Sequence, residues 1–221
     1  MVAISSSQSQ DQQCLSIKLI SWICNVGIDG LGSLPTAHQL STEHLRKCDG
    51  HTKYAVISLL NNTDIGLTSN QFTTDFTLSK HVKVTLPAEL AMSYVMAVNV
   101  AAAIADLYGY DTNSSQVRTM IVGCLIPGGV EEIYKRFNIE IGQKNADGLS
   151  RKLADPLLIR TNKLIGFQLL AEAEIGDLIN FTRKVSQLDP TVSHIFNKAF
   201  VKRCGERAQE IFNSQYALLG Y

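Results

Sequence analysis

Apolar positions along this chain recur at the spacing of a helix, and no segment shows the sustained alternation that is typical of a strand. Near the N-terminus, five apolar residues follow one another as they do on one face of an amphipathic helix: Leu15, Leu19, Trp22, Ile23 and Val26. The pattern predicts a helix over 14–26 with Trp22 in the core. Repeated along the chain, it predicts an all-α fold.

The sequence specifies one stretch most clearly, a pair of helices over 86–129. Pro87 suits a first helical turn, because its φ is preset and it has no N–H that would lack a partner. Glu89 lies in the same turn, where the helix dipole favours a negative charge. Gly109 accepts the left-handed conformation that ends many helices. We therefore predict a helix over about 86–107.

A second helix is expected after a short polar turn, antiparallel to the first. Asn113, with Gln116 three residues later, forms a variant of the capping box and predicts a helix from Asn113 to Ile126. Asp111 lies just before it. An aspartate at such a place usually accepts a backbone hydrogen bond, so we interpret Asp111 as a turn residue rather than a catalytic one.

The first of these helices is apolar on nearly every side, so other helices, a bilayer or a bound hydrophobic molecule must surround it. Its apolar segment, 90–105, is shorter than the about 20 residues that cross a membrane. We predict that it is the buried central helix of a compact multi-helix domain. Met92 and Met96 carry adaptable side chains, which either fill the core or contact a hydrophobic ligand or partner.

Further helices are indicated by helical spacing between prolines, glycines and asparagines. Pro35 opens one of them, with Ser33 available as its cap. The predicted ranges are 35–45, 51–60, 130–137, 156–170 and 190–212. Residues 61–85 are rich in Thr, Asn and Ser, which predicts a long loop with one helical turn or one short extended piece.

The length of 221 residues suits one domain with a substantial core. The N-terminus is rich in Ser and Gln, and it lacks the basic and long apolar segments of a signal peptide. We predict a flexible tail over 1–13, a single helical domain over 14–212 and a loose end over 213–221.

Charge and cysteine content exclude several classes of function. Lys+Arg and Asp+Glu are equal at 20 each, so the chain has no overall excess of positive charge that would bind nucleic acid. The five cysteines are dispersed without a C-x-x-C pair, which indicates reduced core thiols in a cytoplasmic protein rather than a metal site.

Sequence motifs assign no catalytic, cofactor-binding or metal-binding residue. The chain has no G-x-S-x-G nucleophile motif, and no two histidines stand four residues apart as in a zinc helix. The remaining material for a hydrolase or transferase site, assembled only in three dimensions, is scattered along the chain: His51, His81, His194, Asp111 and Glu89.

Basic residues gather in the last predicted helix. Four of them form a basic stripe on the sequence pattern: Lys198, Lys202, Arg203 and Arg207. Such a stripe contacts lipid headgroups or an acidic partner, or it is simply a solvated helix face. We expect any attachment of this protein to a membrane to be peripheral and reversible.

Several segments together resemble the EcsC family of bacterial proteins. They are L-P-A-E-L at 86–90, the apolar helix ending in L-Y-G-Y-D at 101–111, and Q-V-R-T at 116–119. The segments 19–33 and 161–170 are also similar to the family. The resemblance extends over roughly residues 15–212. The residues that carry its motif, and to which it gives a structural role, are Pro87, Glu89, Gly109, Tyr110, Asp111 and Gln116.

The resemblance implies a helical fold and a cell-envelope context. The family takes its name from a gene beside an ABC transporter implicated in secretion, and it has no established enzymatic activity. We therefore expect a non-enzymatic helical module that binds a hydrophobic ligand, a membrane surface or an envelope protein. The alternative is the hydrolase or transferase described above.

This chain departs from the family at three places. Segments 61–84 and 181–198 are polar where family members have Gly-rich apolar stretches, and this difference argues against insertion into a membrane. Asn99 stands where relatives often have arginine, so a role that needs a cation at this position is missing.

Overall fold

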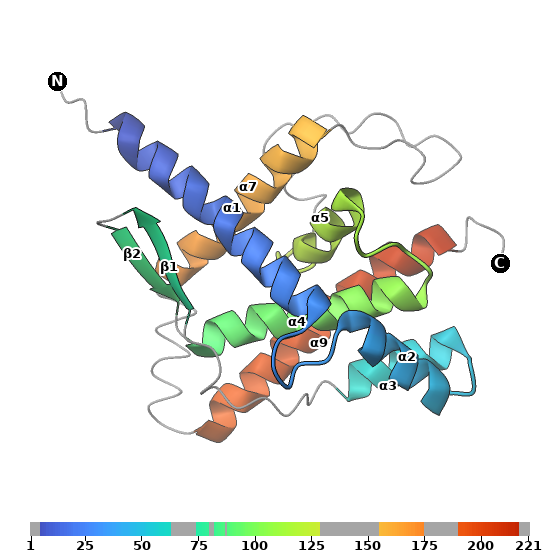
Figure 1. The fold of residues 1–221 in the computed structure, drawn as a ribbon. Coiled ribbons are helices and arrows are strands. Elements are labelled where there is room, and N and C mark those ends of the chain that lie inside the picture. Colours follow the sequence, from blue (N-terminus) through green and yellow to red (C-terminus); the bar gives the residue numbers. More distant parts are fainter. Residues whose placement is uncertain are drawn as a thin grey trace.

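The structure is a computed structural model, and it describes residues 5–62, 74–79, 82–86, 88–128, 155–174 and 190–216. These residues form seven helices and one short hairpin (Figure 1). The helices are α1 (Ser5–Asp29), α2 (Ala37–Lys47), α3 (Thr52–Asn61), α4 (Ala88–Leu107), α5 (Ser115–Gly123), α7 (Asp155–Glu174) and α9 (Pro190–Tyr216). The predicted all-α architecture is confirmed, and the predicted range 130–137 lies outside the described residues.

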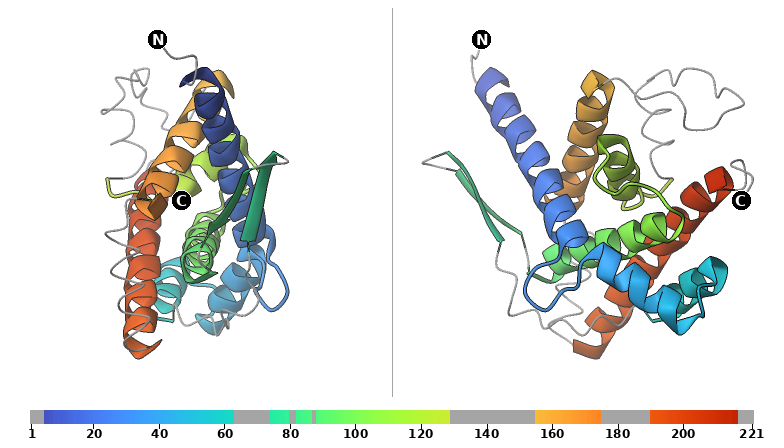
Figure 2. Two further views of the ribbon diagram at one scale, coloured as in Figure 1. Left: turned by 90° about the vertical axis from the view of Figure 1, so that its left-hand side faces the viewer. Right: turned by 45° about the vertical axis from the view of Figure 1, so that its right-hand side comes forward.

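Helix α4 is the centre of the fold, as predicted. It packs against α9, α1, α2, α5 and α3, and Figure 2 shows it between α9 and the α1–α2 segment. Along Leu90–Leu107, 89% of the helix is buried inside the protein. In the described part of the chain, this 18-residue segment alone is long and apolar enough to cross a membrane, a test that the core helix of a globular protein also passes.

The predicted loop over 61–85 contains a β-hairpin, where the sequence predicted one helical turn or one short extended piece. Strand β1 (Thr74–Ser79) pairs antiparallel with β2 (Val82–Leu86), and β1 lies beside α1 (Figure 1). Phe76 lies opposite Val84 in the register. Aromatic and β-branched residues favour strands, and both strands alternate apolar and polar residues, but over only five or six positions each, within a segment whose Thr, Asn and Ser content is typical of a loop.

Three helices are longer than predicted, and one of them, α7, continues past the predicted end at residue 170 to Glu174. Helix α1 begins at Ser5, inside the segment 1–13 that was predicted to be a flexible tail, and α9 continues past the predicted end near Phe212 to Tyr216. Neither of the extensions in α1 and α9 contains a glycine or proline, the two residues that stop a helix most effectively. Their polar composition was therefore not a sufficient reason to end the helices.

The start of α2 also differs from the prediction, because its cap is Thr36 rather than Ser33. The Thr36 hydroxyl accepts a hydrogen bond from the Gln39 backbone N–H at 3.0 Å. The Gln39 side chain accepts one in return from the Thr36 N–H at 2.9 Å. This reciprocal capping box satisfies two N–H groups at the start of the helix.

Three glycines lie where helices approach one another closely. A Cβ atom on Gly27 of α1 would lie 2.5 Å from Val98 Cγ1 of α4. One on Gly166 of α7 would lie 2.5 Å from the Ser16 carbonyl oxygen of α1, and one on Gly205 of α9 would lie 2.5 Å from Leu60 Cδ2 of α3. Because glycine has no side chain at these three positions, α1 packs closely on α4 and α7, and α9 packs closely on α3.

Candidate functional site

The described residues bring one serine, one histidine and one aspartate together, at the junction of α2 and α4. His38 Nδ1 lies 3.0 Å from Asp106 Oδ2, and the Ser41 hydroxyl is hydrogen-bonded to the same carboxylate oxygen. The His38 side chain is 79% exposed and that of Asp106 is 27% exposed, whereas Ser41 is buried. The cluster therefore lies at the surface with its hydroxyl underneath.

This geometry differs from that of a nucleophilic triad. In a triad, the hydroxyl donates to the histidine, and the carboxylate holds the far side of the imidazole ring. Here the serine and the histidine both contact Asp106, so no proton relay links them. Ser41 is also 2.9 Å from the His38 carbonyl oxygen of its own helix. The cluster ties the start of α2 to the last turn of α4.

Sequence reasoning missed this cluster. His38 and Ser41 stand three residues apart on one helix face, a spacing that carries no catalytic meaning by itself. Asp106 lies 65 residues after Ser41. Only the packing of α2 on α4 brings the three side chains together.

A second histidine joins α2 to α3. His44 is buried, and its Nδ1 lies 3.1 Å from the Ser58 hydroxyl. Burial, assisted by the positive charge of Lys47, lowers the pKa of His44 below its ordinary value of 6.5. The neutral imidazole is therefore favoured in this polar contact between the two helices.

The family-motif residues around Gly109 end α4 as predicted. Gly109 has a φ of +80°, and its N–H donates to the Asp106 carbonyl oxygen at 2.9 Å. The Tyr110 N–H donates to the Ala105 carbonyl oxygen at 3.0 Å. These two hydrogen bonds form a Schellman motif. The Tyr110 ring packs on Phe212 of α9, with 5.0 Å between the ring centroids.

The turn that follows confirms one prediction and corrects another. The Asp111 carboxylate accepts a hydrogen bond from the Asn113 backbone N–H at 2.9 Å, so Asp111 is a turn residue as predicted. Asn113 is not the cap of α5. Ser114 occupies that position, because the Asp111 turn places Asn113 before the helix starts. The structure places Gln116, half-buried, in the first turn of α5.

Arg118, in the Q-V-R-T segment, fastens this turn to α1. Its Nη1 donates to Asn25 Oδ1 at 3.1 Å, and its Nε donates to the Thr112 carbonyl oxygen at 3.1 Å. Its Nη2 lies 4.0 Å from an Asp29 carboxylate oxygen. The motif that carries the family resemblance therefore builds a joint between α1, α4 and α5.

Asn99 is a buried structural residue on α4. Its side-chain N–H₂ donates to the Gly27 carbonyl oxygen at 2.7 Å and to the Pro35 carbonyl oxygen at 2.9 Å. Among the described residues, its Oδ1 atom has no hydrogen-bond partner. Asn99 thus fastens both ends of the α1–α2 connection to the central helix with its two donors.

The cysteines whose side chains are described form no disulfide: Cys24, Cys48, Cys124 and Cys204. Cys48 is half-buried and the other three are buried. Burial raises the pKa of the Cys24 thiol to about 12 and raises that of Cys124 still further. The described part of the chain holds no group of three or more metal-ligating side chains.

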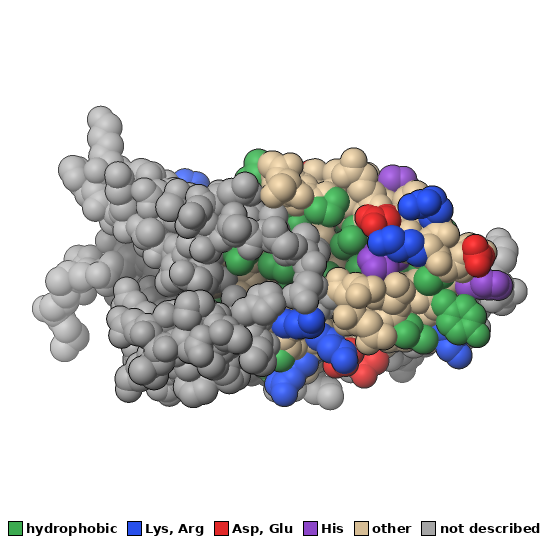
Figure 3. Space-filling model, turned by 90° about the horizontal axis from the view of Figure 1, so that it is seen from below, with side chains coloured by type: hydrophobic (Ala, Val, Ile, Leu, Met, Phe, Trp, Pro, Cys, Tyr) green, Lys and Arg blue, Asp and Glu red, His purple; other side chains and the backbone are tan. Residues whose placement is uncertain are grey.

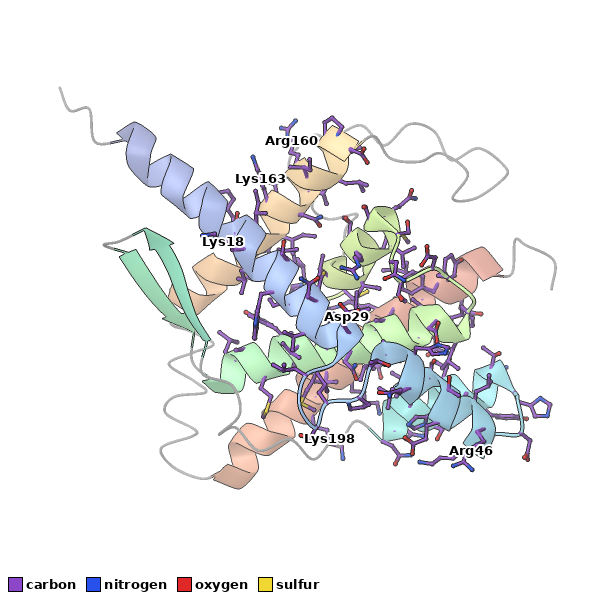
Figure 4. The ribbon with its side chains drawn as sticks, in the orientation of Figure 1. Lys18, Asp29, Arg46, Arg160, Lys163 and Lys198 are labelled. Carbon is purple, nitrogen blue, oxygen red and sulfur yellow. The ribbon has the colours of Figure 1, made fainter. Side chains whose placement is uncertain are left out.

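The basic stripe lies on α9, and its members differ in their surroundings. Lys202 and Arg203 are exposed, and Lys198, labelled in Figure 4, is half-buried. The Arg207 guanidinium instead donates to the Cys124 carbonyl oxygen at 2.8 Å, so it connects α9 to the end of α5. Figure 3 shows acidic side chains interspersed with basic ones on the described surface seen from below.

The remaining predicted residues have the following places. Met96 is buried in the main core, and Met92 is half-buried beside Val26, Leu34 and Val95. Pro87 and His81, as well as the side chains of Glu89 and His194, lie outside what the structure describes. His51 is exposed at the start of α3, with its ring edge-on to Tyr54.

Comparisons of the chain with models of protein families, with curated proteins and with solved structures find no match. The resemblance to the EcsC family therefore stays a prediction.

Proposed function

We propose that this protein is a divergent EcsC-like helical module, without enzymatic activity of its own, that attaches reversibly to a membrane surface. The observation that carries the proposal is the burial of Leu90–Leu107, 89% of which lies inside the protein. This segment is surrounded by other helices, so attachment depends on side chains at the surface. The resemblance supplies the envelope context.

The proposal is tested by cell fractionation followed by vesicle binding. The protein should be released from membranes by high salt or alkaline carbonate, since its contacts are electrostatic and superficial. The purified chain should sediment with vesicles of phosphatidylcholine and phosphatidylglycerol more than with phosphatidylcholine alone. Extraction by detergent only would show that α4 is a membrane element and would overturn the proposal.

Two other partners are distinguished by purification from native membranes and cytosol. An envelope protein recovered in fixed proportion, with no binding to vesicles, would replace the membrane surface as the partner. Lipid analysis of the purified protein would show a hydrophobic ligand, for which Met92 and Met96 are the adaptable contacts.

The alternative function, a hydrolase or transferase, is favoured by one observation, the cluster of His38, Ser41 and Asp106. The test is turnover of a panel of ester substrates by the wild-type chain and by Ser41→Ala. Turnover that disappears in this variant would support an enzyme. A rate equal in both proteins would leave the cluster as a structural joint.

A further inference from the structure

Exposed large apolar side chains are few in the described part of the chain: Ile17, Leu31, Tyr54, Ile57 and Ile159. Two of them directly precede a cation on an exposed helix surface. Ile17 is 38% exposed on α1 and is followed by the exposed Lys18. Ile159 is 54% exposed on α7 and is followed by the exposed Arg160. Exposed aliphatic groups beside cations are typical of surfaces that meet lipid headgroups.

The two helices that carry these pairs are packed against each other. A Cβ atom on Gly166 would lie 2.5 Å from the Ser16 carbonyl oxygen, so the two backbones are in contact at this crossing. Lys18 comes two residues after Ser16, and Lys163 comes three residues before Gly166. Figure 4 shows Lys18, Lys163 and Arg160 in a row that rises from α1 along the N-terminal half of α7.

We infer that this α1–α7 row, made of Ile17, Lys18, Ile159, Arg160 and Lys163, is the surface that binds anionic lipid headgroups. The inference rests on the proposed function and names the face that performs it. The cations meet headgroup phosphates, and the isoleucines reach the boundary of the acyl chains. The close crossing at Gly166 holds the two helices at a fixed angle, so the row is preorganised.

The α9 stripe fits this role less well. Among residues 198–213 of α9, the part of the helix whose side chains the structure describes, no large apolar side chain is exposed. Exposed Glu206 stands four residues after Lys202, where opposite charges on a helix face neutralise each other. On α1 the acidic residue whose side chain is described, Asp29, lies at the C-terminal end, away from Lys18, and on α7 exposed Asp155 stands in the first turn, four residues before Ile159. The exposed isoleucines, rather than an absence of acidic side chains, therefore distinguish the α1–α7 row from the α9 stripe.

The experiment compares two triple variants of the whole chain that change the net charge equally. In one, Lys18, Arg160 and Lys163 are each replaced by glutamine. In the other, Lys198, Lys202 and Arg203 are each replaced by glutamine. Each replaced cation near an anionic surface contributes severalfold to partitioning, so the first variant should bind phosphatidylcholine–phosphatidylglycerol vesicles about tenfold or more weakly. The second should bind within about twofold of the wild type.

A second pair of substitutions tests the apolar part without changing charge. Ile17→Ser combined with Ile159→Ser should weaken vesicle binding at low salt and leave the salt dependence of that binding unchanged, because burial of apolar groups is not screened. Far-UV circular dichroism and the melting temperature show which variants are folded. If the first triple variant is unfolded, the serine pair decides alone.

The possible outcomes separate the two proposals. Weakened binding of the α9 variant, with the α1–α7 variant unchanged, overturns the inference and leaves membrane attachment intact. Equal weakening of both shows attraction by net charge only and also overturns it. If the wild-type chain binds neither kind of vesicle, the proposed function itself fails.

Discussion

Two helix crossings in this fold are equally close, but the glycine faces backbone atoms at one and the ends of side chains at the other. Where α7 crosses α1, the atoms nearest to a Cβ on Gly166 belong to the Ser16 backbone and Cβ. Where α9 crosses α3 and α4, the atoms nearest to a Cβ on Gly205 are ends of side chains, Leu60 Cδ2 at 2.5 Å and Val100 Cγ1 at 3.0 Å. A backbone has no alternative rotamer, whereas a leucine has several. The same short distance should therefore have different energetic consequences.

The largest effect is expected for Gly166→Ala. The new methyl group would lie 2.5 Å from the Ser16 carbonyl oxygen, so α1 and α7 must separate. We expect a loss of about 3 kcal/mol in the free energy of unfolding, at the upper end of overpacking effects, and a fall of about 6–12 °C in Tm. Thermal and urea unfolding measure both. A loss below about 1 kcal/mol would show that the Ser16 backbone does not prevent a side chain at position 166.

Gly109 does not lie at a helix crossing, so a substitution there tests backbone strain without steric crowding. Gly109 has a φ of +80°, and a Cβ atom added to it would have no other atom within 4 Å, so only the backbone conformation opposes a side chain. Gly109→Val should cost about 2 kcal/mol, because a β-branched residue resists the left-handed region. Gly109→Asn, which tolerates that region, is the matched control and should cost clearly less. Equal losses would contradict the assignment.

A smaller effect is expected for Gly205→Ala, about 1 kcal/mol, because Leu60 can change its rotamer and alanine favours the helix. The decisive measurement is a double-mutant cycle with Leu60→Ala. Truncating Leu60 should cost less in the Gly205→Ala background than in the wild type. Additive losses would mean that Leu60 is not the obstacle.

The smallest effect is expected for His44, which joins α2 to α3 through a hydrogen bond rather than through a close approach of the two backbones. Its pKa is lowered in the folded state, so below the ordinary value of 6.5 the unfolded chain binds more protons. Stability should therefore fall as the pH falls from about 7 to about 5. His44→Gln should flatten this slope, and His51→Gln, at an exposed position, should retain it. A slope that is identical in all three proteins would refute the role of His44.

How far the sequence could predict this fold depends on whether the relevant signal was local. The end of α4 followed from Gly109, and the Asp111 turn followed from one side chain and the backbone beside it. The start of α4 lies two residues later than predicted, at Ala88, because Leu86 belongs to β2. The crossing at Gly166 had no such signal, since a helical glycine looks the same whether its partner is a backbone or solvent. The hairpin was missed because its strands are only five and six residues long and lie in a segment rich in Thr, Asn and Ser, which is typical of a loop.

The candidate site was less accessible than the fold. His38, Ser41 and Asp106 meet only because α2 packs on the end of α4, and Arg118 reaches Asn25 across 93 residues of chain. The resemblance covered Arg118 only as part of the segment Q-V-R-T, whose named residue was Gln116, and it noted the unusual residue at Asn99. It could not show that both are joints, because that depends on which carbonyl groups tertiary packing places within reach of their donors.

The hydrogen bonds of Asn99 also have a consequence for the order in which the chain folds. The carbonyl groups of Gly27 and Pro35 emerge from the ribosome early, but the amide that holds them follows Gly27 by 72 residues. During synthesis, α1 and α2 therefore wait for the central helix before their mutual orientation is set. A ribosome paused before Asn99 should hold a nascent chain in which this corner is still open to protease.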